Sequence, residues 1–180
     1  MRNVRKLKLE ELGRDDIDSF KKKAKLPICI VVDNFRSGLN VGSIFRTSDA
    51  FLIERVYLCG ITSTPPHKEI LKTAIGANHS VHWLYKASTT EAIDELVAAE
   101  YKIIGIEQTD ASVPLSEYTI LPTEKYGIVM GNEVEGISET CLSKIDDFIE
   151  IPQHGTKHSL NVSVCAGIVM YKFSQALSNV

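Results

Sequence analysis

Short and almost continuous runs of apolar residues recur along most of the chain, with polar stretches between them. Runs of this length that are rich in Val, Ile and Leu are typical of strands buried on both faces of a parallel sheet. The clearest of them reads "ICIVVDN". The pattern predicts strands at residues 28–34, 55–60, 81–85, 101–107, 126–132 and 148–152.

Stretches with helical periodicity lie between these runs. In "STTEAIDELVAAE" (88–100), Ser88 and Glu91 have the spacing of a helix-capping box. The apolar stripe that follows consists of Ala92, Ile93, Leu96 and Val97. Another helix is expected after the first strand, with an apolar side made of Val41, Ile44, Phe45 and Leu52. The alternation predicts a single α/β domain with a mainly parallel sheet flanked by helices.

The N-terminal segment differs, because its apolar residues are isolated among charges. It predicts a short amphipathic helix or arm that ends before Pro27 and whose apolar residues are Leu7, Leu9, Leu12, Ile17 and Phe20. We therefore expect a helical arm at 1–26 and one domain at 27–180, since 180 residues suit a single core.

Charge is distributed unevenly between this arm and the rest of the chain. The net charge is −3, yet the arm carries a cluster at Lys21, Lys22, Lys23 and Lys25. Five further basic residues, against five acids, precede this cluster: Arg2, Arg5, Lys6, Lys8 and Arg14. A basic arm on an acidic body is compatible with contact to a polyanion, and equally with a solvated charged helix.

Composition argues against several other classes of protein and site. No apolar run approaches the ~20 residues of a membrane span, and the charged N-terminus is unlike a signal peptide, so a soluble cytoplasmic protein is expected. The four cysteines form no Cys-x-x-Cys pair and are expected to be small core residues. The pairs His79/His82 and His154/His158 lack matching cysteine or acidic partners, so no metal is expected.

Polar residues at the carboxyl ends of the predicted strands are the candidates for function, because ligands of parallel α/β folds gather there. After the first strand, a loop with Gly38, Asn40 and Gly42 leads into a helix in which Arg46 lies off the apolar stripe, in about the first turn. Free N–H groups, a glycine-bearing loop and an arginine suit a phosphate or another anion. A surface ion pair of Arg46 with Asp49 or Glu54 is the alternative.

A second candidate follows the strand at 126–132. Gly131, Asn132 and Glu133 end this strand, Gly136 follows, and a helix is expected from about Ser138. Glycines on both sides of a carboxylate would let the loop adopt positive φ and approach a ligand closely. An ordinary turn capped by Ser138 is the alternative. Neither a G-x-G-x-x-G nor a G-x-x-x-x-G-K-[ST] motif is present, which argues against a conventional nucleotide site.

The third candidate, "SLNVSVCAGIVMYKF" (159–173), changes character halfway. Ser159, Asn161 and Ser163 alternate with apolar residues as in a half-buried strand, and the remainder is typical of an apolar helix. A loop bracketed by Pro152 and Gly155 precedes it.

Taken together, the three segments resemble the motifs of the SpoU (TrmH-type) branch of the SPOUT RNA methyltransferases. The matching residues are Asn40-x-Gly42-x-x-x-Arg46, Gly131-Asn132-Glu133-x-x-Gly136 and Pro152-x-x-Gly155-x-x-x-Ser159-Leu160-Asn161-Val162-Ser163. Three motifs in this order make the resemblance specific, and it extends from Pro27 onward. Gln153 and Cys165 depart from the methionine and alanine that are usual in the family.

The resemblance implies a fold and an activity. It implies transfer of a methyl group from S-adenosylmethionine to a ribose 2′-hydroxyl of RNA, with tRNA slightly preferred over rRNA because a compact dimer with a basic arm could grip a small folded RNA. It also implies a C-terminal deep trefoil knot that holds the cofactor, and a homodimer with the site at the interface. Residues 159–163 then become a loop that enters a helix rather than a strand.

Carried over residue by residue, the resemblance implies catalytic roles for Arg46, Glu133, Ser159 and Asn161. It implies cofactor contacts for Gln108, Thr109, Gly131, Ile151 and Leu160, and substrate contacts for Asn40 and Arg46, to which the arm adds Lys21, Lys22 and Lys23. A free arginine keeps its proton up to a pKa above about 12. Arg46 is therefore either a base in an unusual setting or a clamp on an RNA phosphate. An RNA-binding member with little catalysis and a small-molecule enzyme with the same pocket are the alternatives.

Overall fold

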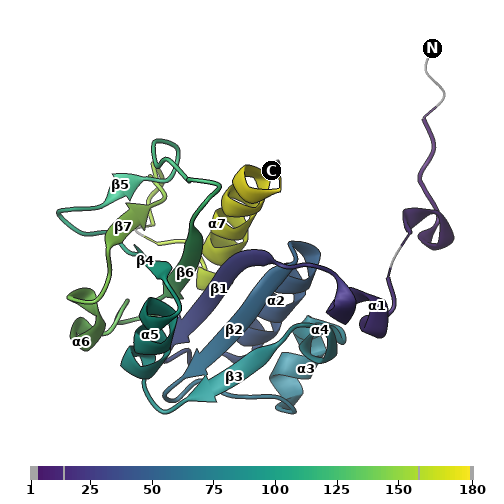
Figure 1. Cartoon of the computed structure of the whole chain (residues 1–180), viewed down its shortest axis with the longest axis horizontal. Coiled ribbons are helices and arrows are strands. Elements are labelled where there is room, and N and C mark those ends of the chain that lie inside the picture. Colours follow the sequence, from purple (N-terminus) through teal and green to yellow (C-terminus); the bar gives the residue numbers. More distant parts are fainter. Residues whose placement is uncertain (1–3, 14, 158, 179–180) are drawn as a thin grey trace.

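The computed structural model describes residues 4–13, 15–157 and 159–178, so Arg2, Arg14 and His158 lie outside it. Its centre is one parallel sheet of seven strands in the order β3-β2-β1-β6-β4-β7-β5 (Figure 1). The strands are β1 Leu26–Asp33, β2 Ile53–Cys59, β3 Trp83–Lys86, β4 Tyr101–Ile106, β5 Val113–Pro114, β6 Lys125–Met130 and β7 Asp147–Glu150. The six predicted strands and the α/β class are confirmed. The two-residue β5 was missed, because so short a segment carries no periodicity.

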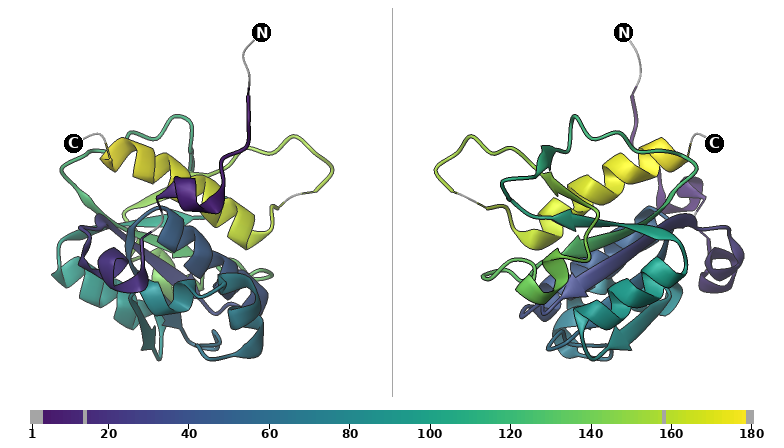
Figure 2. Two further views of the ribbon diagram at one scale, coloured as in Figure 1. Left: turned by 90° about the vertical axis from the view of Figure 1, so that its right-hand side faces the viewer. Right: turned by 60° about the vertical axis from the view of Figure 1, so that its left-hand side comes forward.

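Helices cover both faces of the sheet. One face packs against α2 (Gly38–Ala50), α3 (Lys68–Ala74), α4 (Ala77–Ser80) and α7 (Val162–Leu177), and the other against α5 (Thr89–Ala98) and α6 (Glu139–Leu142). In the right-hand view of Figure 2 the sheet lies between α7, in yellow, and α5, in teal. Strands buried on both faces explain why their sequences are nearly continuous in apolar character.

Helix α2 begins earlier than the sequence pattern suggested. Ser37 is its N-cap and accepts a hydrogen bond from the Asn40 N–H (3.3 Å). Asn40 and Gly42 are therefore helical rather than part of a loop, and Arg46 lies in the third turn rather than the first. Leu52 lies outside the helix, at a φ of 53°. The sequence pattern missed the helix start because Gly38 and Gly42 lie in its first turns and glycine is more common in loops.

Gly42 is required by the close packing of α2 on α3. A Cβ at this position would lie 2.1 Å from the Thr73 hydroxyl oxygen and 2.4 Å from the main-chain oxygen of Ile70. The same Thr73 hydroxyl donates to the Leu39 main-chain oxygen (2.9 Å). The two helices therefore touch through main chain, which leaves no space for a side chain.

The N-terminal arm forms two short helices instead of one. A 3-10 helix spans Leu9–Leu12, and α1 spans Ile17–Lys22 beside α4. Phe20 is buried, and the Lys25 ammonium lies 4.2 Å from the centre of its ring. Ile17 is exposed, so the predicted amphipathic pattern holds at Phe20 alone in α1.

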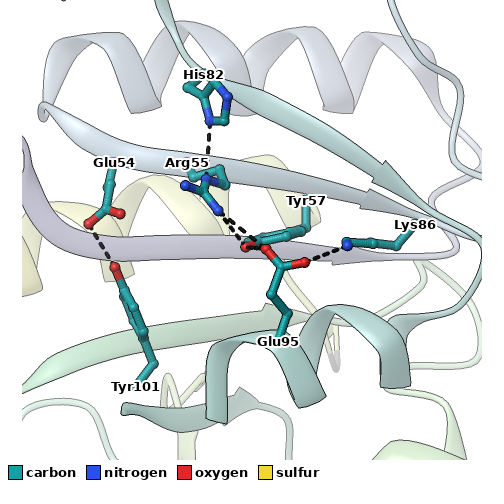
Figure 3. A network of polar contacts seen from close by, with 7 residues as sticks. All are labelled: Glu54, Arg55, Tyr57, His82, Lys86, Glu95 and Tyr101. Atoms are coloured by element: carbon teal, nitrogen blue, oxygen red, sulfur yellow. Dashed lines mark hydrogen bonds and ion pairs between the residues drawn. The ribbon is translucent and has the colours of Figure 1, made fainter. Parts of the chain in front are cut away.

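A polar network fastens α5 to the edge of the sheet (Figure 3). Glu95 of α5 accepts from the Tyr57 hydroxyl (2.7 Å) and pairs with Arg55 (3.3 Å) and Lys86. The Arg55 Nε–H in turn donates to His82 Nδ1 (3.1 Å). Burial, followed by the hydrogen bond to Glu95, raises the pKa of Tyr57 to about 12, so the phenol remains a donor.

The cysteines belong to the core of the domain or lie at its border. Cys29, Cys59 and Cys141 are buried free thiols and Cys165 is half-buried, as expected for small core residues. The described residues contain no cluster of three or more side chains that could hold a metal ion. None of the described helices is both long enough and apolar enough to cross a bilayer.

Replacing Gly42 by alanine should test the contact between α2 and α3. We expect the free energy of unfolding to fall by about 1–3 kcal/mol, because the added methyl group overpacks the contact. Gly167 of α7 is the matched control, since a Cβ there would meet nothing closer than Thr47 Cγ2 at 4.0 Å. Gly167→Ala should raise stability by about 0.5–1 kcal/mol through helix propensity. Urea unfolding measures both variants, and equal effects would contradict the packing argument.

Candidate active site

A buried carboxylate organises the carboxyl edge of the sheet. Asp33, at the end of β1, is fully buried and accepts from the Ser138 N–H (2.7 Å), from the Asn34 side-chain amide (2.8 Å) and from the Thr89 hydroxyl. Ser138 and Thr89 begin α6 and α5. Ser138 thus helps to fix the edge through its main chain, while its side chain makes no capping hydrogen bond.

The loop after β6 closes on itself and on the end of β1. Asn132 and Gly136 exchange two main-chain hydrogen bonds (2.8 and 3.0 Å), and the Asn132 side-chain amide donates to the Asn34 main-chain oxygen. Gly136 has a φ of 72°, as the glycine pattern predicted. Gly131 does not have positive φ, but a Cβ on it would lie 2.3 Å from the main-chain carbon of Gly136. Both glycines are therefore needed, each for a different reason.

Glu133, in the same loop, holds the start of α2. Its carboxylate accepts from the Arg36 N–H (2.9 Å), the Ser37 N–H (3.1 Å) and the Asn40 side-chain amide (2.9 Å). Burial alone would raise the pKa of Glu133, but these donors outweigh it and hold the pKa below its usual value. The carboxylate stays ionised and takes the place that an anion occupies at other helix N-termini.

Asn161 connects the third motif to the other two. Its side-chain amide donates to Asn40 Oδ1 (3.2 Å), while its Oδ1 accepts from the Ser163 N–H (2.9 Å) and hydroxyl (2.7 Å). Asn161 is thus the N-cap of α7, which begins at Val162. The stretch 159–163 is a loop that enters a helix and not a strand. Its polar residues Asn161 and Ser163 alternate with apolar ones because they form the cap of α7.

These loops surround a cavity of about 420 Å³. Seven of the predicted site residues line it: Gln108 after β4, Gly131 and Glu133 after β6, Ile151 after β7, and Ser159, Leu160 and Asn161 before α7. Its wall also includes Glu107, Met130, Glu150 and Cys165, which were not predicted as site residues. Polar and apolar groups therefore meet in one recess, as in many small-molecule sites.

Glu107 is the most informative of the residues that sequence reasoning missed. Its carboxylate accepts from the Ile137 N–H (3.0 Å) and would lie 2.2 Å from a Cβ on Gly136. It follows the strand "YKIIGI" directly, so its position at a strand end was the available signal.

The structure places the remaining predicted residues outside the lining of this cavity. Asn40 lies one hydrogen bond behind it, through Glu133 and Asn161. Thr109 forms a local turn in which its oxygen accepts from the Ser112 hydroxyl (2.9 Å). The side chain of Arg46 is exposed on α2, without a hydrogen bond or ion pair to any described residue. The expected alternative, a surface ion pair of Arg46, is therefore absent from the described part of the chain.

The arm lysines lie far from the cavity within one chain. Lys21, Lys22 and Lys23 are exposed at the end of α1, before the amino end of β1. The cavity lies at the carboxyl ends of the strands, and an eight-residue strand such as β1 spans roughly 26 Å.

A comparison of the chain with known protein families shows which family it matches. The model of the SpoU rRNA Methylase family matches residues 27–171. The chain belongs to this family. In this SpoU member the second and third motifs line the cavity, and Asn40 of the first motif contacts both of them from behind it. A Staphylococcus epidermidis protein named for the TrmH family of tRNA/rRNA methyltransferases is 33% identical over 153 residues, which are 84% of this chain. The chain spans about 60% of the length of that relative.

Solved structures share the fold of this SpoU member. An rRNA methyltransferase from Sinorhizobium meliloti with bound AdoMet has a TM-score of 0.77 and 25% identity, over 89% of this chain and 60% of its own. A TrmH/SpoU tRNA-modifying enzyme from A. aeolicus has a TM-score of 0.79 and 24% identity, over 91% and 81%. AviRb from Streptomyces viridochromogenes, also with AdoMet, has a TM-score of 0.77 and 20% identity, over 94% and 68%.

The hydrogen bonds from Arg36, Ser37 and Asn40 to Glu133 form a clamp on the start of α2. Replacing Glu133 by glutamine should weaken this clamp. We expect the free energy of unfolding to fall by about 1–2 kcal/mol at neutral pH, because hydrogen bonds to a charged acceptor are lost. Glu135→Gln is the control, since Glu135 is exposed in the same loop, and it should change stability by less than about 0.5 kcal/mol.

The clamp also predicts a pH dependence. Because the pKa of folded Glu133 lies below the usual value of 4.5, the unfolded chain takes up the proton first as the pH falls. The contribution of Glu133 is therefore complete above that value and is lost as the pH falls through the folded pKa. Urea unfolding at a series of pH values should show a shallower acid slope for Glu133→Gln than for the natural chain, and identical slopes would contradict the clamp.

Proposed function

We propose that this chain is an S-adenosylmethionine-dependent methyltransferase that acts on the 2′-hydroxyl of an RNA ribose. The observation that carries the proposal is that the second and third SpoU motifs line one cavity and that Asn40 of the first motif is joined to it by hydrogen bonds to Glu133 and Asn161. The family membership and the AdoMet-bound Sinorhizobium meliloti enzyme support it. We also expect the trefoil knot of this family in the C-terminal region.

The residues of the cavity fit this cofactor. The volume of about 420 Å³ lies within the range of small-molecule pockets. Gly131 and Gly136 bring main chain to the wall, and Leu160 and Ile151 offer apolar contact. The carboxylates of Glu107 and Glu150 suit a cofactor that carries a positive charge. Thr109 would contribute through its turn beside Gln108 rather than through the wall itself.

The protein's own task is to orient the ribose and to make its hydroxyl more nucleophilic. The cofactor supplies a methyl group that is already activated as a sulfonium. We assign the orientation of the ribose to Ser159, which is exposed at the cavity rim, and to Asn161, whose amide is fixed by Asn40. Glu133 positions these groups through α2. Arg46 contributes its guanidinium, as a base or as a clamp on the adjacent phosphate.

The position of Arg46 favours a homodimer. Its exposed side chain does not reach the cavity of its own chain, so we propose that it acts in the site of a second copy. Exposed apolar residues lie on α2 and α7, the two helices that pack together: Leu39, Val164, Ile168 and Tyr171. A second copy would cover this surface. Light scattering of the purified chain tests the dimer directly.

A methylation assay tests the activity. The chain is incubated with labelled S-adenosylmethionine and with tRNA and rRNA that lack modifications, and the RNA is then digested and analysed by mass spectrometry. We expect a 2′-O-methyl nucleotide, with tRNA as the preferred substrate. Cofactor binding without incorporation into any RNA would instead support an RNA-binding protein with little catalysis, and methylation of a base would overturn the ribose assignment.

Arg46→Lys should separate a specific role of the guanidinium from a simple positive charge. We expect turnover to fall at least about tenfold with unchanged cofactor affinity, because lysine lacks the planar fork of donors. Arg5→Lys is the control, since Arg5 is exposed in the N-terminal arm and pairs there with Glu11. Near-normal turnover of Arg46→Lys would remove the guanidinium from the mechanism.

The arm lysines are proposed to contact RNA in the assembled enzyme. Changing Lys21, Lys22, Lys23 and Lys25 together to alanine should weaken RNA binding and flatten its salt dependence, because fewer counterions are released. Cofactor affinity should not change, since α1 lies away from the cavity. Binding titrations at several salt concentrations measure the slope, and an unchanged slope would remove the arm from the RNA interface.

A further inference from the structure

The cations around α5 and those around α2 and α3 differ in their partners. Those that face α5 are neutralised: Arg55 and Lys86 pair with Glu95, and Lys144 pairs with Asp94. A polyanion that approached this side would have to compete with carboxylates already in place.

The cations on α2, on α3 and in the loop before α2 have no such partners. Arg36, Arg46, Lys68 and Lys72 are all exposed, and none forms an ion pair within the described residues. Lys68 and Lys72 are four positions apart on α3, so their side chains lie on one side of that helix. Unpaired cations keep their full attraction for phosphate.

The packing of α3 on α2 places these cations next to the cavity rim. Ser37, which precedes α2, donates to Glu133 in the cavity wall. A Cβ on Gly38, the next residue, would lie 2.9 Å from the Glu69 Cβ and 3.0 Å from His67 Nδ1. Lys68 lies between these two contact residues in sequence. The Arg36 N–H is also bonded to Glu133, which brings its exposed side chain to the same rim.

We infer that Arg36, Lys68 and Lys72 form a docking strip for the phosphates of the RNA substrate. The inference rests on the proposed function and specifies the surface along which the RNA reaches the cavity. The strip is separate from the arm, which lies toward the amino ends of the strands. In a chain with a net charge of −3, these unpaired cations lie where phosphates must pass on their way to the site.

The double variant K68Q/K72Q tests the strip against K125Q/K144Q, which removes the same charge elsewhere. All four lysines are exposed, so both variants should fold. Binding of a fluorescently labelled, unmodified tRNA transcript is measured over a range of salt concentrations. We expect the salt slope of K68Q/K72Q to fall by about 2, one unit for each lost phosphate contact, with a weaker affinity, while K125Q/K144Q keeps the natural slope.

Two further measurements separate the possible failures. Calorimetry with S-adenosylmethionine should give the same affinity for all three proteins, which shows that the cavity is intact. If the natural chain methylates RNA but K68Q/K72Q and K125Q/K144Q have equal slopes, the docking strip is overturned and the proposed function stands. If the natural chain binds the cofactor but neither binds nor methylates RNA, the proposed function falls and the strip falls with it.

Discussion

The carboxylate of Asp33 is the interaction on which the functional edge of the sheet depends. It lies at the end of β1, an interior strand of the sheet, is fully buried, and accepts hydrogen bonds from the starts of α5 and α6. A buried charge without such donors would be very costly, so these two helix starts have to lie beside β1. Asn34, at a φ of 55°, extends the arrangement because it accepts from the Ile61 N–H and from the Asn132 amide.

Once that edge is fixed, a second set of contacts joins segments that are remote in sequence. Glu133 binds Asn40 across 93 positions, and Asn161 binds Asn40 across 121. The side chains of Glu133 and Asn161 each have two roles. Glu133 binds the main chain just before α2, Asn161 caps α7, and both line the cavity. The same side chains therefore hold the starts of the helices and shape the cavity, so that the two are coupled.

Much of this architecture could be predicted from the sequence. The strands were predictable because burial on both faces demands uninterrupted apolar runs, and the family resemblance located seven of the cavity residues. The start of α2 was not, because Gly42 is demanded by α3, which is distant in sequence. Glu107 was missed because its role depends on Ile137, a contact across 30 positions that no local pattern encodes. The exposure of Arg46 was likewise not predictable, because it depends on the position of the helix start and on how α2 packs on the rest of the domain.

The glycine contact between α2 and α3 has a consequence for how a substrate could be selected. At Gly42 the two helices lie so close that α3 cannot move nearer to α2 without a steric clash. This contact helps to fix the distance between α3 and the mouth of the cavity. A substrate that contacted both α3 and the cavity would therefore be selected by its length and shape.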